Sequence, residues 1–458
     1  MKTYRPYQPQ QLLLLPEDMR KWLPADHLAY FISEVVESFD LSAITAEYER
    51  ELRGNPPWHP QMMVKLWLYG YCVGKPSSRQ VERACLEEVP FRVLSANSQP
   101  DHRPLSEFRR RHLQALRGLF VQVLQIARKA GLVSLGYVAL DGTKVKANAS
   151  RHKAMSYQRM REEEERLTGE IQALLDAGVA MDEAEDRRYG KDRRGDELPA
   201  ELARREQRLR AIREAKVALE AEAQAAADRM SGEPPPPAVP KDKAQRNFTD
   251  PESRIMKSSE KAFIQAYNCQ AVVDGRAQII VACAVSGQAA DTPQLEPMLE
   301  RVIENCGEAP RRLSADAGYC SENNLAIASE HGIDTYIATG KDQHNRTPLP
   351  APRGRVPQGL SAKERMARKL RTKSGKGWYA KRKGLVEPVF GQIKQGRRFL
   401  QFLLRGQEKT SGEWSLICTG HNLLRMWRVK CAEDRVGRAG GVCTGLALQR
   451  KLGLSMAG

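Results

Sequence analysis

The chain has 458 residues, too many for a single hydrophobic core, so two or three domains are expected. Lysine and arginine number 73 against 56 acidic residues, and the resulting net charge of +17 favours a polyanionic partner. The nine cysteines include no Cys-x-x-Cys pair, and the sequence shows neither a signal-peptide pattern nor an apolar run of membrane-spanning length. These features argue against a zinc-binding, secreted or membrane protein, and a cytoplasmic protein with reduced thiols is expected.

Residues 1–55 indicate an irregular arm followed by a helix, and residues 60–130 carry the periodicity of short helices. Apolar side chains in the segment 61–73 recur on one helix face, and Ser77 with Gln80 predicts a capping box at the start of a second helix. A third helix is expected to begin near Leu105. Its first turns are expected to hold three consecutive arginines, Arg109, Arg110 and Arg111. Two interpretations remain open: a helix-turn-helix DNA reader that uses these arginines, or an ordinary helical bundle with a solvated basic face.

The short apolar run 137–140 predicts a strand that ends at Asp141. A carboxylate at the end of a buried strand is costly unless it is solvated, paired or bound to a metal ion. Lys144 and Lys146 follow at alternate positions and would share one side of an extended chain. Next to Asp141, phosphate contact is the favoured interpretation of these two lysines, and solvation is the alternative.

The segment 152–245 contains two heptad-like apolar series. Their spacings of three, four and seven residues predict helices that pack along a seam. The first series is Met160, Leu167, Ile171 and Leu174, and the second is Leu202, Leu209, Ile212 and Leu219. Because linkers do not keep a heptad, an antiparallel helical hairpin inserted into another domain is the simplest interpretation.

Strand and helix signals resume after this segment. Two strand-like segments, 263–273 and 278–285, flank the hairpin-type dipeptide Asp274-Gly275. The following elements are a helix over 292–306 that starts after Asp291, a strand over 313–315, a helix over 322–331 and a strand over 335–338. With 137–140 they predict a mixed sheet that has an early hairpin and later crossover helices. This order is compatible with a ribonuclease-H-like fold of mixed α+β and α/β character, interrupted by the helical hairpin.

Two further acids lie where a carboxylate suits metal binding better than packing. Asp316 ends a predicted strand. Glu387 lies in the most basic part of the chain, because residues 351–400 hold fifteen lysines and arginines and only two acids. Pro388 suits the first turn of a helix, so Glu387 is expected at a helix N-terminus with Lys394 on the same face. Two aspartates and a glutamate amid positive charge suggest a Mg²⁺ site that acts on a nucleic-acid backbone.

A resemblance to a known family is carried by five phrases, at residues 99–103, 139–148, 247–253, 315–319 and 386–394. Each phrase alone is a weak signal, but their order and spacing together are specific, and they run almost from end to end. The sequence resembles the DDE transposases of bacterial insertion sequences, and most nearly the group named for insertion sequence eleven-eighty-two. The resemblance implies an enzyme that cleaves the ends of its element and joins them to target DNA.

The resemblance also implies the roles of individual residues. Asp141, Asp316 and Glu387 correspond to the three acids of the family motif and would hold two Mg²⁺ ions, with Mn²⁺ as a substitute. Asp141 would bridge both ions, and the other two acids would each complete one. The family carries a tyrosine and an arginine before the glutamate and a lysine after it. The corresponding phosphate-binding candidates are Tyr379, Arg382, Lys383 and Lys394, with Arg382 and Lys383 both open for the arginine role.

This interpretation divides the chain into a helical DNA-binding region (1–130), a ribonuclease-H-like catalytic domain (131–151 and 246–430), a helical hairpin insertion (152–245) and a C-terminal tail (431–458). The expected partners are double-stranded DNA, as terminal inverted repeats and as target, and further copies of the chain, because two ends must be held together. When bound to DNA the protein would be associated with the nucleoid.

Two other functions remain open. One is a metal-dependent nuclease that cuts without joining, and the other is a DNA-binding regulator descended from a transposase and no longer catalytic. The intact acidic triad argues against the regulator, because a pure binder gains nothing from carboxylates that face phosphates.

Overall fold

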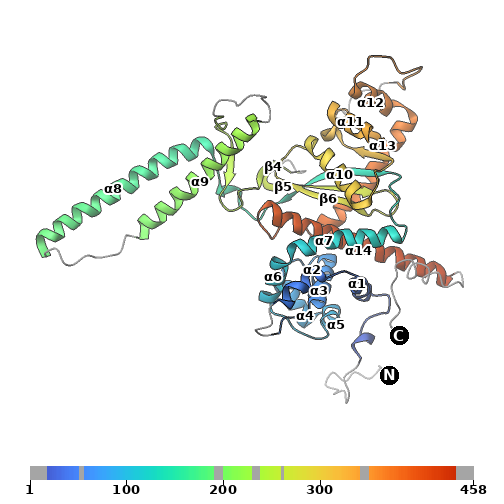
Figure 1. Cartoon of the computed structure of the whole chain (residues 1–458), viewed down its shortest axis with the longest axis horizontal. Helices are drawn as coiled ribbons and strands as arrows, with labels where there is room; N and C mark the ends of the chain where they lie inside the picture. Colours follow the sequence, from blue (N-terminus) through green and yellow to red (C-terminus); the bar gives the residue numbers. More distant parts are fainter. Residues whose placement is uncertain are drawn as a thin grey trace, which may run out of the picture.

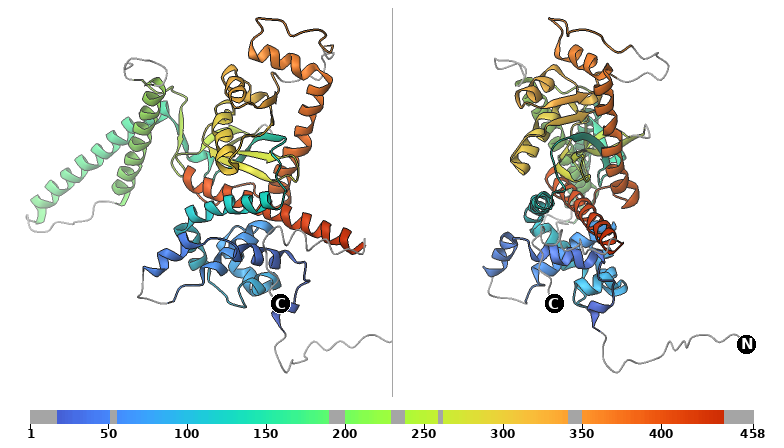
Figure 2. Two further views of the ribbon diagram at one scale, coloured as in Figure 1. Left: turned by 45° about the vertical axis from the view of Figure 1, so that its right-hand side comes forward. Right: turned by 90° about the vertical axis from the view of Figure 1, so that its right-hand side faces the viewer.

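The computed structural model describes residues 18–50, 56–189, 200–228, 238–258, 262–340 and 350–439. A group of short helices lies below a sheet with its covering helices, and a long helical hairpin extends to one side (Figure 1). Two helices, α7 (Leu113–Lys129) and α14 (Gln407–Ala439), lie together between the helical group and the sheet (Figure 2). No helix among the described residues is both long and apolar enough to cross a membrane.

The first part of the described chain is helical, as its periodicity predicts. Before α7 it contains α1 (Leu28–Glu37), α2 (Ser42–Glu49), α3 (Pro60–Val73), α4 (Ser78–Glu87), α5 (Val89–Leu94) and α6 (His102–Arg111). The predicted capping box is confirmed at the start of α4, where Ser77 and Gln80 each bond the backbone N–H of the other. The helix α3 ends at Gly74, whose φ of +78° suits glycine; a Cβ there would lie 2.6 Å from the carbonyl oxygen of Arg397.

The three consecutive arginines lie at the end of α6, and the prediction that they open this helix is wrong. The side chain of Asp101 accepts from the backbone N–H of Arg103 at 3.0 Å and caps the helix, which therefore begins at His102. The last turn contains Arg109, Arg110 and Arg111. Their positive charges there interact favourably with the carbonyl end of the helix dipole.

A six-stranded mixed sheet forms the second part. Its strands are β1 (Val138–Lys146), β4 (Arg254–Lys257), β5 (Phe263–Asp274), β6 (Ile280–Ser286), β7 (Arg312–Ala315) and β8 (Asp334–Ile337). The order is β4-β5-β1-β7-β8, with β6 also paired to β5. Strand β1 is antiparallel to β5 and parallel to β7, which is in turn parallel to β8. The predicted mixed sheet is confirmed, and its order is consistent with a ribonuclease-H-like domain.

Strand β1 is longer than its sequence indicates. It runs through Asp141 to Lys146, because the long antiparallel strand β5 continues to pair with it, for example between Asp141 and Ala271. The parallel partner β7 pairs only with Val138 and Ala139. The prediction that Asp141 ends a strand is therefore wrong. Asp141 lies just beyond the point where the parallel partner of β1, the strand β7, ends.

Helices pack on the sheet and join it to the first part of the chain. The helices α10 (Leu295–Cys306), α13 (Lys373–Gly391) and α14 contact its strands, and α11 (Glu322–Glu330) and α12 (Ala362–Arg371) pack against β8. The indole N–H of Trp414 in α14 donates to the carbonyl of Gln270 in β5 at 3.0 Å, and Ser415 donates to the carbonyl of Arg117 in α7 at 3.3 Å. One continuous hydrophobic core extends from α1 through the sheet to α14.

The helical hairpin has its own small core. Its helices are α8 (Tyr157–Tyr189) and α9 (Ala200–Asp228), and the antiparallel strands β2 (Ala154–Ser156) and β3 (Gln245–Asn247) close its base. The buried members of the predicted heptad series are Met160, Leu167, Leu202, Leu209, Ile212 and Leu219, while Ile171 and Leu174 are half-buried. The predicted seam between two helices is therefore present.

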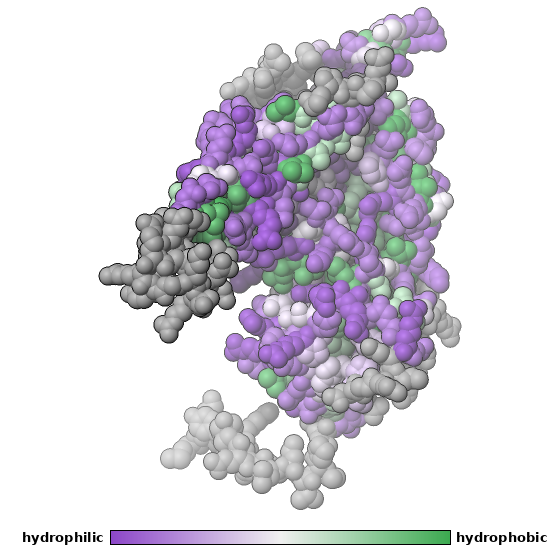
Figure 3. Space-filling model, turned by 60° about the vertical axis from the view of Figure 1, so that its left-hand side comes forward, coloured by the Kyte–Doolittle hydropathy of each residue, from purple (hydrophilic) through white to green (hydrophobic). Residues whose placement is uncertain are grey.

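The molecular face in Figure 3 is mainly hydrophilic, and its hydrophobic side chains form small separate groups.

Some expected segments extend beyond the described residues. The expected C-terminal tail, 431–458, is helical as far as Ala439, and residues 440–458 lie outside the described part of the chain. Residues 1–17 of the first region, and residues 190–199 and 229–237 of the insertion, also lie outside it.

Candidate active site

Asp141 and Asp316 lie next to each other at the end of the parallel strand pair. The register pairs Ala139 with Ser314, and its continuation by two residues brings Asp141 opposite Asp316, the first residue after β7. The carboxylate of Asp316 accepts a backbone hydrogen bond at 2.8 Å, which caps the short 3-10 helix η4 (Ala317–Tyr319). Two aspartates from distant parts of the sequence thus lie side by side where the parallel pairing of β1 and β7 ends.

Asp141 is held by an ion pair and by its own backbone. Its Oδ2 accepts from Nη1 of Arg382 at 2.8 Å, and its Oδ1 accepts from the backbone N–H of Gly142 at 2.9 Å. The side chains of Asp141 and Arg382 are 17% and 11% exposed, so water screens the pair weakly. Burial is the main cause that raises the pKa of Asp141 to about 6, while Arg382 lowers it and Asp316 raises it. Burial therefore disfavours the ionised form of Asp141 more than the positive charge of Arg382 favours it.

The helix α13 carries Arg382 and Glu387 along the sheet. The prediction that a helix begins at Pro388 is wrong, because Pro388 lies inside α13, near its C-terminal end. Proline has no N–H to donate to the carbonyl of Gly384, and this carbonyl accepts instead from the side-chain amide of Gln278 at 3.3 Å. The turn between β5 and β6 thus satisfies the group that the proline leaves without a helical partner. Glu387 is therefore part of a continuous helix.

Glu387 is exposed and lies between two contacts of its chain segment with β1. Before it, Arg382 pairs with Asp141. After it, Nζ of Lys394, in the π-helical turn that follows α13, donates to the carbonyl oxygen of Lys144 at 2.7 Å. In the described part of the chain the three carboxylates do not all lie within 4.8 Å of one another. Their convergence on shared metal ions therefore remains a prediction.

The two lysines of β1 lie in different environments. Nζ of Lys144 donates to the carbonyl of Ala289 at 3.0 Å and pairs with the carboxylate of Asp291 at 3.3 Å, so its charge is partly balanced by protein. Lys146 is exposed. Lys146 is therefore the more accessible of the two to a phosphate.

The residues of α13 that resemble the family's basic motif also differ in accessibility. Arg382 is buried beside Asp141, and its guanidinium carbon lies 5.8 Å from the centroid of the Tyr379 ring. Lys383 is exposed on the helix, and Tyr379 is half-buried. Of the two candidates for the arginine role in the family motif, Arg382 lies at the carboxylate of Asp141 and Lys383 lies at the surface.

Arg109 is buried, which contradicts its predicted exposure to DNA. It is only 6% exposed, and its Nη1 donates to the carbonyl of Pro76 at 2.6 Å and to the hydroxyl of Tyr71 at 3.3 Å. Its guanidinium carbon lies 4.4 Å from the centroid of the Trp67 ring, a cation–π contact. Arg109 therefore stabilises the packing of α6 on α3.

The other two arginines of α6 are exposed, so DNA contact stays a prediction for them. The guanidinium of Arg110 pairs with the carboxylate of Glu107, one turn earlier, at 2.7 Å. Arg111 is the last residue of the helix.

Asp291 belongs to this part of the molecule although its sequence context indicated only a helix start. A short 3-10 helix, η3 (Thr292–Gln294), does begin after it, but its side chain makes no capping bond. Instead, its Oδ1 accepts from the side-chain amides of Asn268 at 2.7 Å and Gln270 at 3.0 Å, both of which are fully buried in β5. Asn268 and Gln270 are polar residues of a buried strand, and such side chains require polar partners; this was the signal in the sequence that could have pointed to Asp291.

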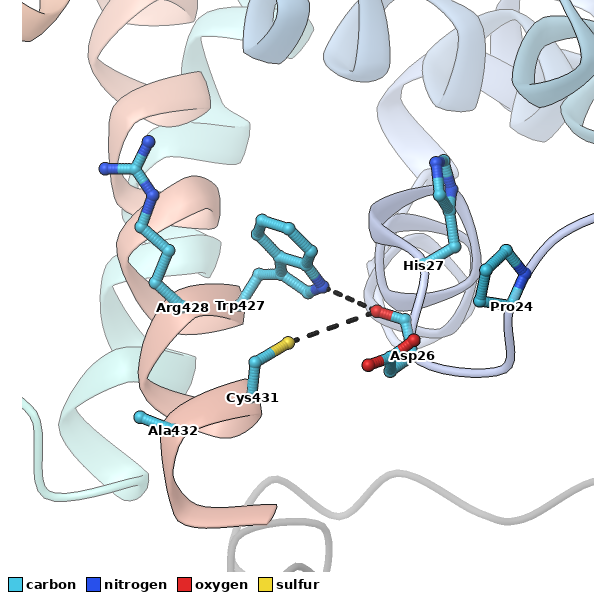
Figure 4. Close-up of a pocket in the computed structure, with 7 residues that line it drawn as sticks. All are labelled: Pro24, Asp26, His27, Trp427, Arg428, Cys431 and Ala432. Carbon is cyan, nitrogen blue, oxygen red and sulfur yellow. Dashed lines mark hydrogen bonds between the residues drawn. The ribbon is translucent and has the colours of Figure 1, made fainter. Parts of the chain in front are cut away.

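A cavity of about 310 Å³ lies elsewhere, between the start of α1 and the end of α14 (Figure 4). The indole N–H of Trp427 donates across it to the backbone carbonyl of Asp26 at 2.9 Å. None of its lining residues belongs to the group around Asp141 and Asp316. The cavity is therefore separate from the candidate active site.

Two parts of the chain match known protein families. Residues 237–423 match the family model of the transposase DDE domain, and residues 17–111 match that of the transposase domain DUF772. The chain carries a DDE transposase domain. It is a phosphoryl-transfer enzyme of transposition, and its substrate is DNA. A search of curated proteins and a search of solved structures each found no match.

The match to the transposase DDE domain includes Asp316 and Glu387, whereas Asp141 lies between the two matched ranges. The helical hairpin separates Asp141 from the rest of the sheet in sequence, and the pairing of β1 with β5 and β7 brings it back in space. The matches bear out the predicted transposase domains, and the narrower insertion-sequence group stays a prediction. Transposases with a DDE domain use divalent metal ions.

Proposed function

We propose that the protein is the transposase of an insertion sequence in the group named for insertion sequence eleven-eighty-two, acting in the cytoplasm on nucleoid DNA. It binds the terminal inverted repeats of its element, cleaves the ends with water, and joins the freed 3′-hydroxyls to target DNA. The observation that carries this proposal is the juxtaposition of Asp141 and Asp316 beside the helix that contains Glu387. It occurs in a chain with a transposase DDE domain.

The residues at this place suit a divalent cation. Carboxylate oxygens are the ligands that Mg²⁺ prefers, and Mn²⁺ accepts the same ligands. The pKa of Asp141, raised to about 6 mainly by burial, indicates a carboxylate with too little positive charge around it. Asp141, Asp316 and Glu387 would hold two ions, which when bound would activate the attacking oxygen and stabilise the leaving oxygen.

Other residues of the chain prepare the site for its substrate. Arg382 partly balances the charge of Asp141 before a cation is bound, and its guanidinium becomes available to a phosphate afterwards. Lys394 holds the end of α13 against β1 through the carbonyl of Lys144, and this contact positions Glu387.

DNA binding is divided between two surfaces. Exposed lysines and arginines lie along α12 and along α13, the helix that contains Glu387: Lys363, Arg365, Lys373, Lys376, Lys381 and Lys383. With Tyr379 and Lys146 they would bind the DNA backbone near the cleavage site, which holds DNA without reading its sequence. The helical region 1–130 would read the repeats, because base recognition needs a helix in a groove, and Arg110 and Arg111 lie on its surface.

The domain organisation follows from these roles. The catalytic domain comprises residues 131–151 and 246–430, and the hairpin at 152–245 is an insertion into it. A homo-oligomer forms on the DNA, because both ends of the element must be held during joining.

The test is a cleavage and joining assay with DNA that carries the terminal repeat, using Asp141→Asn, Asp316→Asn and Glu387→Gln. Each variant should lose cleavage and joining in Mg²⁺, because transition-state charge is no longer stabilised. Each should still bind the repeat, because affinity comes mainly from lysine and arginine contacts with phosphate. Glu364→Gln, in the same basic stretch, is the matched control and should remain active.

Three outcomes separate the alternatives. Cleavage without joining by the wild type would support a nuclease, and binding without cleavage by the wild type would support a regulator. Near wild-type cleavage by any of the three triad variants would overturn the assignment of that residue.

A further inference from the structure

Asp291 lies between β6 and α10, and its carboxylate packs behind β1. Successive residues of a strand point to opposite faces, so Asp141 faces α13 while Gly142 and Lys144 face the other way. Asp291 lies on this second face, where it pairs with Lys144. The carboxylates of Asp141 and Asp291 thus lie on opposite faces of the same segment of β1.

One oxygen of Asp291 collects three donors. Its Oδ1 accepts from Asn268 at 2.7 Å, from Gln270 at 3.0 Å and from Nζ of Lys144 at 3.3 Å. The side-chain oxygen of Gln270 in turn accepts from the hydroxyl of Tyr319, which is fully buried. A continuous set of hydrogen bonds therefore links Asp291 to the residue that lies three positions after Asp316.

Two glycines provide the space that Asp291 occupies: Gly142, directly after Asp141, and Gly318, two residues after Asp316. A Cβ at Gly142 would lie 2.9 Å from Oδ1 of Asp291. A Cβ at Gly318 would lie 3.4 Å from Cβ of Asp291 and 3.0 Å from Oδ1 of Asp316. The next residue, Thr292, donates from its hydroxyl to the carbonyl of Gly318 at 2.7 Å. Asp291 and its turn are therefore packed against both aspartate segments.

We propose that Asp291 is a positioning residue of the catalytic centre, which sets the separation between Asp141 and Asp316 and so the affinity of the pair for divalent cations. This inference rests on the proposed function. The charge of Asp291 matters because a half-buried carboxylate with three donors, one of them a lysine ammonium, forms strong and directional hydrogen bonds. Groups that orient metal ligands from behind typically change metal affinity or activity by about 10-fold to 100-fold when they are removed.

The experiment measures Mn²⁺ binding to the full chain by isothermal titration calorimetry without DNA, and cleavage of repeat-end DNA as a function of Mg²⁺ concentration. Asp291→Ala should weaken Mn²⁺ binding by about 10-fold to 100-fold and raise the Mg²⁺ concentration for half-maximal cleavage by a similar factor. Asp291→Asn keeps one acceptor oxygen and should lie between Asp291→Ala and the wild type. Binding of repeat-end DNA should not change in either variant.

The control is Asp274→Asn, at the C-terminal end of β5, the strand that also holds Asn268 and Gln270. Asp274 is fully buried, and its carboxylate accepts from the backbone N–H of Leu135 at 2.8 Å, away from Asp141 and Asp316. This variant should lower the thermal unfolding temperature without altering Mn²⁺ affinity.

The results distinguish this inference from the proposed function. If Asp141→Asn leaves Mn²⁺ binding unchanged, the metal site itself is misassigned. If Asp141→Asn loses Mn²⁺ binding while both Asp291 variants retain wild-type affinity, Asp291 does not position the site. Should Asp291→Ala fail to fold, Asp291→Asn alone decides, because its amide is close in size to the carboxylate.

Discussion

Neutralising Asp141 is expected to stabilise the protein while it abolishes catalysis. The pKa of Asp141 rises from the ordinary value of 3.8 to about 6 in the folded chain, mainly because of burial. Between these values the folded state binds more protons than the unfolded state, so this carboxyl makes the free energy of unfolding fall as pH rises. Above pH 6 the loss is nearly complete and amounts to about 3 kcal/mol at about 1.36 kcal/mol per pKa unit, as an upper value.

Asp141→Asn retains the shape of the side chain without its charge. In a chelator at pH 8 the variant should therefore be more stable than the wild type by about 1 to 3 kcal/mol, and near pH 4 the difference should become small. Urea denaturation at the two pH values measures both differences, and added Mg²⁺ should stabilise the wild type only. If the variant were less stable than the wild type at pH 8 without metal, attraction to Arg382 would outweigh burial and the reasoning would be refuted.

Three further outcomes follow from the positions of individual side chains. Arg109→Met should lower the free energy of unfolding by about 2 to 3 kcal/mol, because the buried carbonyl of Pro76 and hydroxyl of Tyr71 lose their donor, whereas Arg111→Ala should change it by less than about 0.5 kcal/mol; urea denaturation compares the two variants, and equal effects would contradict the difference in burial between the two arginines. Replacing Lys381 and Lys383 by glutamine should weaken binding equally on repeat and random DNA and reduce the salt slope by about 2, as measured by fluorescence anisotropy; a loss confined to repeat DNA would contradict backbone binding. Leu167→Ala should increase hydrogen exchange in α8 and α9 but not in β1, because the hairpin core is separate, and faster exchange in β1 would show that the cores are coupled.

Local patterns predicted most of the secondary structure. The capping box at Ser77 and the strands β5 to β8 depend on residues that are neighbours in sequence, so pattern and turn chemistry were sufficient. The extent of β1 was not predictable in this way. Its continuation past Asp141 depends on pairing with Ala271, which lies far along the chain beyond the helical hairpin.

The candidate site was predictable in its acids but not in its supporting contacts. Pro388 suggested a helix start because proline is common there, and the bond from Gln278 to the carbonyl of Gly384 that permits an interior position is long-range. The burial of Arg109 has a local signal in the sequence. Arg109 lies four residues after Leu105 and shares its buried helix face, whereas its charge alone favours exposure.

The short strands at the base of the helical hairpin have a consequence for protein engineering. Pairing of Ala154 with Asn247 fixes the distance between the two points where the hairpin leaves the catalytic domain, whatever lies between them. We therefore expect the hairpin to behave as a replaceable module. Its arms should tolerate shortening by whole heptads, or its far end should accept a fluorescent protein as a reporter, while the sheet that holds Asp141 keeps both of its neighbouring strands.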